Sequence, residues 1–196
     1  CSGEPSREEL PLDLDPYGWP RAGALDVRHL PTTVAAQGVA PLADSLDRIH
    51  EYQRRLYAGR RYGVLLVVQG LDAAGKDSLI RTLARALDPA AFRAHSFARP
   101  LGEEVRHDFL WRVWRRLPEQ GEVVAFNRSH YEAVLAERLW PTSDIGVDWR
   151  GRYRAIKEFE GHLHREGTRF IKVWLNTSED EQRRRLLKRL DKPRKR

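Results

Sequence analysis

Cysteine, methionine and long apolar runs are scarce or absent in this sequence, and each absence narrows the class of protein. Cys1 is the one cysteine among 196 residues, so an internal disulfide framework is impossible and a reducing, cytoplasmic location is expected. No run of about 18 apolar residues occurs, so we expect neither a transmembrane helix nor a membrane partner.

The two ends of the sequence also lack the marks of a complete chain. Methionine is absent even at position 1, and the sequence stops shortly after a strongly basic segment. We therefore expect that the chain begins after its translation start and that its C-terminus is truncated.

Positive charge, by contrast, is in excess. Lysine and arginine together number 35 against 28 aspartates and glutamates, which gives a formal net charge of +7 at pH 7. Such a balance indicates a polyanionic partner. Nucleic acid is one such partner, but the sequence has neither zinc-finger spacing nor an RNA-binding aromatic motif, so nucleic acid is not expected.

The order of the predicted elements indicates an α/β fold. Apolar runs predict strands and amphipathic stretches predict helices, in alternation, after an irregular lead-in over 1–40. Strands are predicted at 62–69, 95–98, 123–126 and 169–175, and helices at 41–57, 76–87, 103–117, 131–139, 149–165 and 179–190. This alternation is typical of a parallel sheet with helices on both faces, here a three-layer α/β/α domain over 41–196.

The segment between the first strand and the next helix has the pattern of a phosphate-binding P-loop. Gly70 and Gly75 bracket it, Lys76 ends it, and the following helix directs its positive N-terminal end toward the loop. The candidate phosphate- or nucleotide-binding residues here are Gly70, Ala73, Ala74, Gly75, Lys76, Asp77 and Ser78. A glycine-rich turn without a ligand is the alternative.

Two carboxylates make this loop unusual. Asp77 takes the place of the hydroxyl that normally follows the lysine, and Asp72 lies inside the loop. An anion within a phosphate cradle repels its ligand unless a cation stands between them. The loop therefore indicates Mg²⁺ as a cofactor, with Asp72 as a candidate ligand.

Polar residues also follow the third predicted strand. Because ligands bind at the carboxyl ends of parallel strands, Asn127 and Arg128 should face the loop, Asn127 as a second metal ligand and Arg128 as a charge against moving phosphates. Asn127 could also cap the next helix, and the two roles can coexist. Tyr131 and Glu132 are candidate nucleotide contacts, although Glu132 could equally serve as a partner of the helix dipole.

The basic helix predicted at 179–190 has two possible roles. Arg185 and Arg189 are four residues apart and therefore share one face. The helix could be a lid that closes over phosphates, or a solvated cationic helix, and the spacing alone does not distinguish them.

Taken together, these segments resemble the polyphosphate kinase 2 family. Residues 70–77 are similar to its Walker A motif, and 126–132 to its Walker B motif. Further similarities are 108–112, then Trp149, Arg152, Tyr153, Ile156, Phe159 and Glu160, and, in the lid, 180–182, Arg185, Arg189, Asp191 and Pro193. The resemblance runs from about 46 to 193.

The resemblance implies a P-loop kinase fold with a helical lid, and Mg²⁺-dependent, reversible transfer of the terminal phosphoryl group of inorganic polyphosphate to nucleoside mono- and diphosphates. AMP and ADP would be the acceptors, with GMP and GDP as further ones, and the chain would form a homo-oligomer, a dimer or tetramer. The catalytic residues would be Asp72, Lys76, Asn127, Arg128, Arg185 and Arg189. Asn127 together with Glu132 resembles the subgroup that accepts both mono- and diphosphates.

Two other functions remain possible on the residues alone. An ATP-dependent nucleoside monophosphate or small-metabolite kinase would have a similar loop, and a non-catalytic nucleic-acid-binding P-loop protein would have a basic surface. The sequence offers cations and metal-binding acids but no obvious catalytic base. This favours a phosphate acceptor, because a nucleotide phosphate is already an anionic nucleophile whereas an alcohol must lose a proton.

Overall fold

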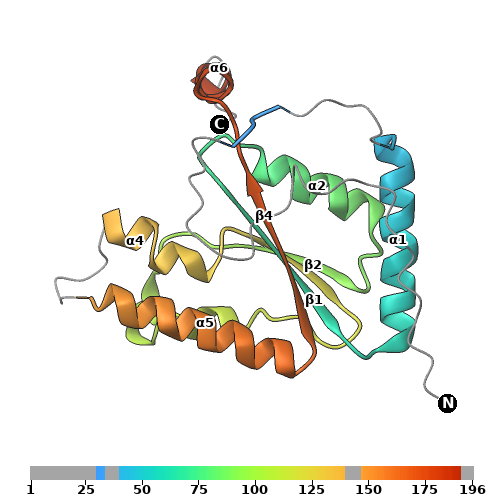
Figure 1. The fold of residues 1–196 in the computed structure, drawn as a ribbon, viewed down its shortest axis with the longest axis horizontal. Coiled ribbons are helices and arrows are strands. Elements are labelled where there is room, and N and C mark those ends of the chain that lie inside the picture. Colours follow the sequence, from blue (N-terminus) through green and yellow to red (C-terminus); the bar gives the residue numbers. More distant parts are fainter. Residues whose placement is uncertain (1–29, 34–39, 140–146, 191–196) are drawn as a thin grey trace.

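Four parallel strands form the centre of the molecule (Figure 1). The computed structural model describes residues 30–33, 40–139 and 147–190. The sheet has the order β2-β3-β1-β4, and its strands are β1 (Gly63–Gly70), β2 (Phe92–Ser96), β3 (Val123–Asn127) and β4 (Thr168–Leu175). Most of the predicted lead-in over 1–40, and the end at 191–196, lie outside the described residues.

Helices cover both faces of this sheet. Helices α1 (Leu42–Gly59) and α2 (Lys76–Ala86) lie on one face and α5 (Trp149–Arg165) on the other (Figure 1). Successive strand residues point to opposite faces, so Leu65 and Val67 of β1 join the core beneath α5, whereas Leu66 and Val68 join the core beneath α2. The predicted three-layer α/β/α arrangement is confirmed.

Two predicted helices are wrong as continuous elements. The helix predicted at 103–117 is a 3₁₀ turn, η2 (Gly102–Arg106), and a short helix, α3 (Trp111–Trp114). Asp108 separates them, because its carboxylate accepts a hydrogen bond from the Leu110 backbone N–H at 2.9 Å and holds a turn instead of a helix.

The helix predicted at 131–139 is likewise a 3₁₀ turn, η3 (His130–Ala133), followed by the one-turn helix α4 (Ala136–Leu139). The Ser129 hydroxyl accepts from the Tyr131 N–H at 3.2 Å and caps this turn. The second strand also begins earlier than predicted, at Phe92 instead of His95.

The carboxyl ends of the strands bring distant segments together. β1 runs into the loop 71–75 and α2, β3 runs into η3, and β4 leads to the basic helix α6 (Glu179–Leu190), which stands above this edge of the sheet (Figure 1). No helix in the described part of the chain combines the length and apolarity that crossing a membrane requires.

Candidate active site

The loop between β1 and α2 forms a polar cradle. A cavity of about 210 Å³ opens above it. Its lining residues are Asp72, Ala73, Ala74, Gly75, Lys76, Asp77, Ser78, Asn127, Arg128 and Arg189. The structure therefore brings together, around one cavity, most of the residues that the sequence analysis selected from three separate segments.

The backbone of this loop depends on its glycines. Gly75 has φ +106°, a left-handed conformation that L side chains rarely adopt. Gly70 lies so close to the end of β4 that an added Cβ would be 2.9 Å from the Leu175 carbonyl oxygen. Because it has no Cβ, Gly70 lets the start of the loop pack against the end of β4, although Gly70 does not line the cavity itself.

Lys76 lies at the floor of the cradle. Its side chain is buried, with 9% of the residue exposed, and its Nζ donates to the Gly70 and Leu71 carbonyl oxygens at 2.8 and 2.9 Å. Burial lowers the pKa of Lys76 and the Arg128 guanidinium lowers it further, against the carboxylates of Asp72, Glu132 and Asp77. An entering phosphate would favour the protonated lysine and reverse this effect.

Asp72 and Arg128 meet across the mouth of the cradle. Arg128 Nη2 lies 3.2 Å from Asp72 Oδ1, and the Asp72 side chain is 74% exposed. An ion pair this exposed contributes little to stability. Its carboxylate is therefore free to take a cationic ligand, and its guanidinium is free to take an anionic one.

Asn127 lies beside the start of α2. Its side-chain amide donates to an Asp77 carboxylate oxygen, and both residues line the cavity. This contact joins the end of β3 to the first turn of α2. Asn127 is therefore placed at the cradle as predicted, with its amide nitrogen directed to Asp77.

A second cavity, of about 490 Å³, adjoins the first. Leu71, Asp72, Phe97, Ala98, Arg99, Pro100, Arg128, Glu132, Ala136, Glu137 and Leu139 line it. Burial raises the pKa of Glu132, against the lowering effect of the Arg128 guanidinium. Asp72 and Arg128 belong to both cavities, so they form a shared wall between them.

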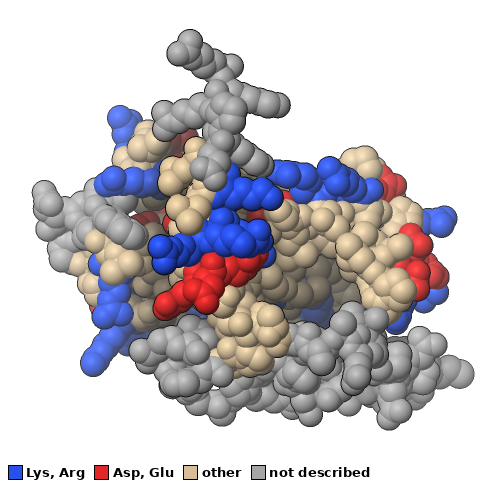
Figure 2. All heavy atoms as spheres, turned by 90° about the horizontal axis from the view of Figure 1, so that it is seen from above, with Lys and Arg blue, Asp and Glu red and all other residues tan. Residues whose placement is uncertain are grey.

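Helix α6 is attached to the outer side of the loop. Arg185 Nη1 donates to the Ala73 and Ala74 carbonyl oxygens at 3.1 and 2.9 Å, and Gln182 Nε2 donates to the Asp72 carbonyl oxygen at 2.8 Å. Glu181 holds Arg185 through an Nε–Oε1 contact of 2.6 Å. Figure 2 views this end from above, where basic side chains gather over the middle beside an acidic group.

The two arginines that the sequence analysis assigned to a lid, Arg185 and Arg189, occupy different positions. Arg189 lines the cradle cavity, whereas Arg185 lines a third cavity of about 520 Å³ between the loop and α6. Arg189 and Lys188 also line this third cavity. Helix α6 is therefore packed against the loop, and its role as a lid that closes over phosphates stays a prediction.

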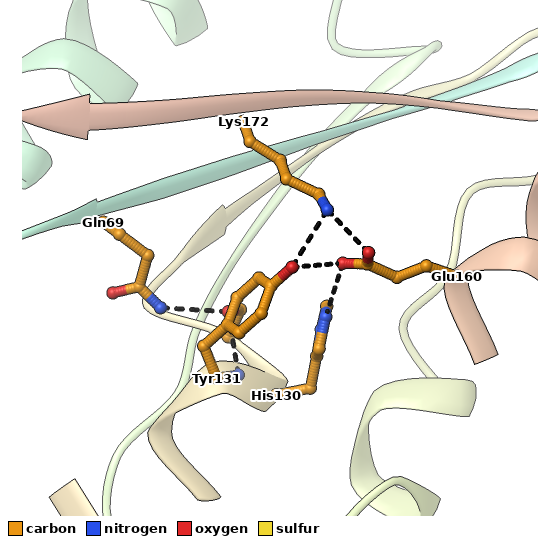
Figure 3. Close-up of polar contacts among 6 residues, drawn as sticks. Gln69, His130, Tyr131, Glu160 and Lys172 are labelled. Carbon is orange, nitrogen blue, oxygen red and sulfur yellow. Dashed lines mark hydrogen bonds and ion pairs between the residues drawn. The ribbon is translucent and has the colours of Figure 1, made fainter. Parts of the chain in front are cut away.

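Tyr131 lies apart from the cradle. Its hydroxyl donates to Glu160 at 2.6 Å and accepts from Lys172 at 2.9 Å, so it faces α5 and β4 (Figure 3). His130 contacts the same Glu160 carboxylate at 3.1 Å. The sequence analysis assigned no role to His130 or Lys172. The one signal that could have indicated His130 is its position three residues after Asn127, the last residue of β3.

The parallel sheet with its order β2-β3-β1-β4 and the glycine-bracketed loop after β1 place the chain in the class of P-loop α/β proteins. The chain belongs to the polyphosphate kinase 2 family, because the model of that family, described as polyphosphate kinase 2 (PPK2), matches residues 35–196. In the structural comparison, polyphosphate kinase 2 from Arthrobacter aurescens has a TM-score of 0.80 and 34% identity, with 91% of this chain and 67% of that chain covered.

Two relatives give the same result at the sequence level. The ADP-polyphosphate phosphotransferase of Rhodopseudomonas palustris is 43% identical over 165 residues, which cover 79% of this chain and 57% of that protein. The AMP/ADP-polyphosphate phosphotransferase of Meiothermus ruber is 46% identical over 149 residues, which cover 76% and 55%. The chain thus spans a little over half the length of these relatives.

Proposed function

We propose that this protein transfers the terminal phosphoryl group of inorganic polyphosphate to AMP and ADP, reversibly and with Mg²⁺. The observation that carries the proposal is the shared wall of Asp72 and Arg128 between two cavities. A donor phosphate in one cavity and an acceptor phosphate in the other would meet at these two side chains. Names of the relatives, which refer to polyphosphate and to AMP or ADP, support the choice of substrates.

The donor end of polyphosphate fits the cradle. The start of α2 and Lys76 offer backbone N–H groups and a cation there, and Arg189 faces the same cavity. The third cavity continues from the cradle beneath α6 and is lined by Arg185, Lys188 and Arg189. A linear polyanion would extend into it, since every repeating unit carries a charge that these side chains can neutralise.

The acceptor nucleotide fits the second cavity, where Leu71, Phe97 and Leu139 offer apolar surface and Arg128 offers a charge. The terminal oxygen of a nucleotide phosphate is already anionic, so no base need remove a proton from it. Orientation and charge neutralisation are sufficient for its attack on the donor phosphorus. Tyr131, a predicted nucleotide contact, would then act from a distance.

The residues of the cradle are suited to Mg²⁺. No cluster of three or more His, Cys, Asp or Glu side chains that could enclose a metal occurs in the described ranges. Mg²⁺ commonly takes one or two carboxylates and completes its shell with water and substrate phosphates. The exposed Asp72 would hold it, with Asn127 as a further oxygen ligand after its amide turns, and the ion would neutralise charge on the transferring phosphoryl group.

The family membership also leads us to expect a particular range of acceptors, an oligomeric state and a location in the cell. We infer that the chain accepts both nucleoside mono- and diphosphates, GMP and GDP included, and that it forms a dimer or tetramer in the cytoplasm. Measurement of turnover with each nucleotide tests the range of acceptors. Light scattering, which gives the mass in solution, tests the oligomeric state.

The test is a coupled assay of AMP and ADP with polyphosphate and Mg²⁺, on this chain and on a longer version of it. We expect ATP from ADP, and a loss of at least about 100-fold in kcat for Asp72→Asn with the fold retained. Transfer that requires ATP and ignores polyphosphate would favour an ATP-dependent kinase instead. Salt-sensitive nucleic-acid binding without any transfer would favour the non-catalytic alternative.

A further inference from the structure

Three side chains from two elements, η3 and β4, converge on one carboxylate of α5 (Figure 3). Glu160 of α5 lies 2.6 Å from Lys172 Nζ of β4, 2.6 Å from the Tyr131 hydroxyl and 3.1 Å from His130 Nε2. Because a carboxylate only accepts, His130 carries its proton on Nε2. We call Glu160, His130, Tyr131 and Lys172 the Glu160 cluster.

Two hydrogen bonds to the Ser129 hydroxyl connect the Glu160 cluster to the loop, and we call this pair of bonds the Ser129 relay. The Ser129 hydroxyl accepts from the Tyr131 backbone N–H at 3.2 Å and from Gln69 Nε2 at 3.0 Å. Gln69 directly precedes the first glycine of the cradle. The cluster therefore fixes η3 at one end, and the end of β1 fixes it at the other.

Arg128 lies between the end of β1 and the Glu160 cluster, and its backbone conformation is strained. Its φ is +63°, which is left-handed for a residue with a Cβ, and its backbone N–H donates to the Val68 carbonyl oxygen at 3.1 Å. Such a conformation persists only where the surroundings hold it, and it is commonly found at functional sites. Here the surroundings are the Ser129 relay and the Glu160 cluster.

We propose that the Glu160 cluster positions Arg128 for phosphoryl transfer, so that Tyr131 and Glu160 act on the reaction without touching substrate. The inference rests on the proposed function for its kinetic consequence, and it gives Tyr131 a role other than nucleotide contact. The Tyr131 hydroxyl donates its one proton to Glu160 and accepts from Lys172, so it has no proton left to donate to a ligand.

The first test is Tyr131→Phe, with Tyr153→Phe as the matched control, since Tyr153 is exposed on α5. We expect kcat to fall about tenfold, the loss of one hydrogen bond to a charged group, while KM for nucleotide and polyphosphate stays within about twofold. Lys172→Met, with the exposed Lys157→Met as its control, should act in the same direction and leaves the half-buried Tyr131 ring unchanged.

The second test separates positioning from general loosening. In an Arg128→Ala background, Tyr131→Phe should cause less than about a twofold further loss in kcat, because the group being positioned is gone. Equal losses in both backgrounds, or an unchanged kcat in Tyr131→Phe, would overturn the proposal.

A third measurement does not depend on activity. Amide hydrogen exchange over 127–130 should be faster in Tyr131→Phe and unchanged in Tyr153→Phe. Unchanged exchange in Tyr131→Phe would refute the positioning role even if the enzyme proved inactive toward polyphosphate. An inactive wild type with faster exchange in Tyr131→Phe would refute only the proposed function.

Discussion

Replacement of Glu160 by glutamine should make the stability of the protein depend less on pH. Burial by itself raises the pKa of this carboxyl, but hydrogen bonds from His130, Lys172 and Tyr131 outweigh burial and lower the pKa from 4.5 to about 2. The folded state therefore holds this proton less tightly than the unfolded chain. Glu160→Gln keeps the shape of the side chain and removes the charge that these donors require.

The size of the effect follows from the two pKa values. The difference between 4.5 and about 2, at roughly 1.4 kcal/mol for each pKa unit, corresponds to about 3 kcal/mol in the free energy of unfolding at neutral pH. The Lys172 side chain is 45% exposed and regains water when its partner is lost. We therefore expect a net loss nearer about 2 kcal/mol for Glu160→Gln.

The sign of the pH dependence is fixed by the direction of the change. Because the folded pKa lies below the unfolded one, the stabilisation is fully present above pH 4.5 and is lost as the pH falls toward 2. Urea unfolding at pH 7, 4 and 3 measures the difference in the free energy of unfolding between wild type and Glu160→Gln, provided that the m-value is unchanged. Glu158→Gln, on the same helix but exposed, is the control. A difference between wild type and Glu160→Gln that is the same at all three values would refute the reasoning.

Two further substitutions test the scaffold of the site. Gly70→Ala should destabilise the fold by about 2 kcal/mol and lower activity, because the new Cβ meets the Leu175 carbonyl oxygen, whereas Gly59→Ala, with open space around it, should have little effect on the thermal midpoint. Gln53→Leu should cost about 2 kcal/mol in urea unfolding, because the buried Gln53 amide bonds both the N–H and the carbonyl of Asp88, at 2.8 and 3.0 Å, and leucine leaves both without a partner.

Local patterns were sufficient to predict most of the fold. β1 is buried on both faces, so its sequence is an apolar run with no alternation, and the glycines and lysine of the loop follow it directly. The bounds of α6 and α5 agree with those predicted. The break at Asp108 was missed because one side-chain hydrogen bond outweighed a helical pattern of apolar residues.

The Glu160 cluster could not be predicted in the same way. Its members come from α5, β4 and η3, and Tyr131 and Glu160 are separated by 29 positions in the chain. Their meeting depends on how α5 lies over the sheet and on which face of β4 carries Lys172. These are properties of packing, and no local spacing in the sequence encodes them.

The attachment of α6 to the outer carbonyl groups of the loop has a consequence for ligand length. Under the proposed function, a short phosphate such as pyrophosphate reaches the cradle alone, whereas a long chain also reaches the basic residues of the third cavity. The second contact then forms at a high effective concentration, so affinity rises with chain length until both cavities are filled and then levels off. The chain length at which the affinity levels off would then be set by the distance from Lys76 to the basic face of α6.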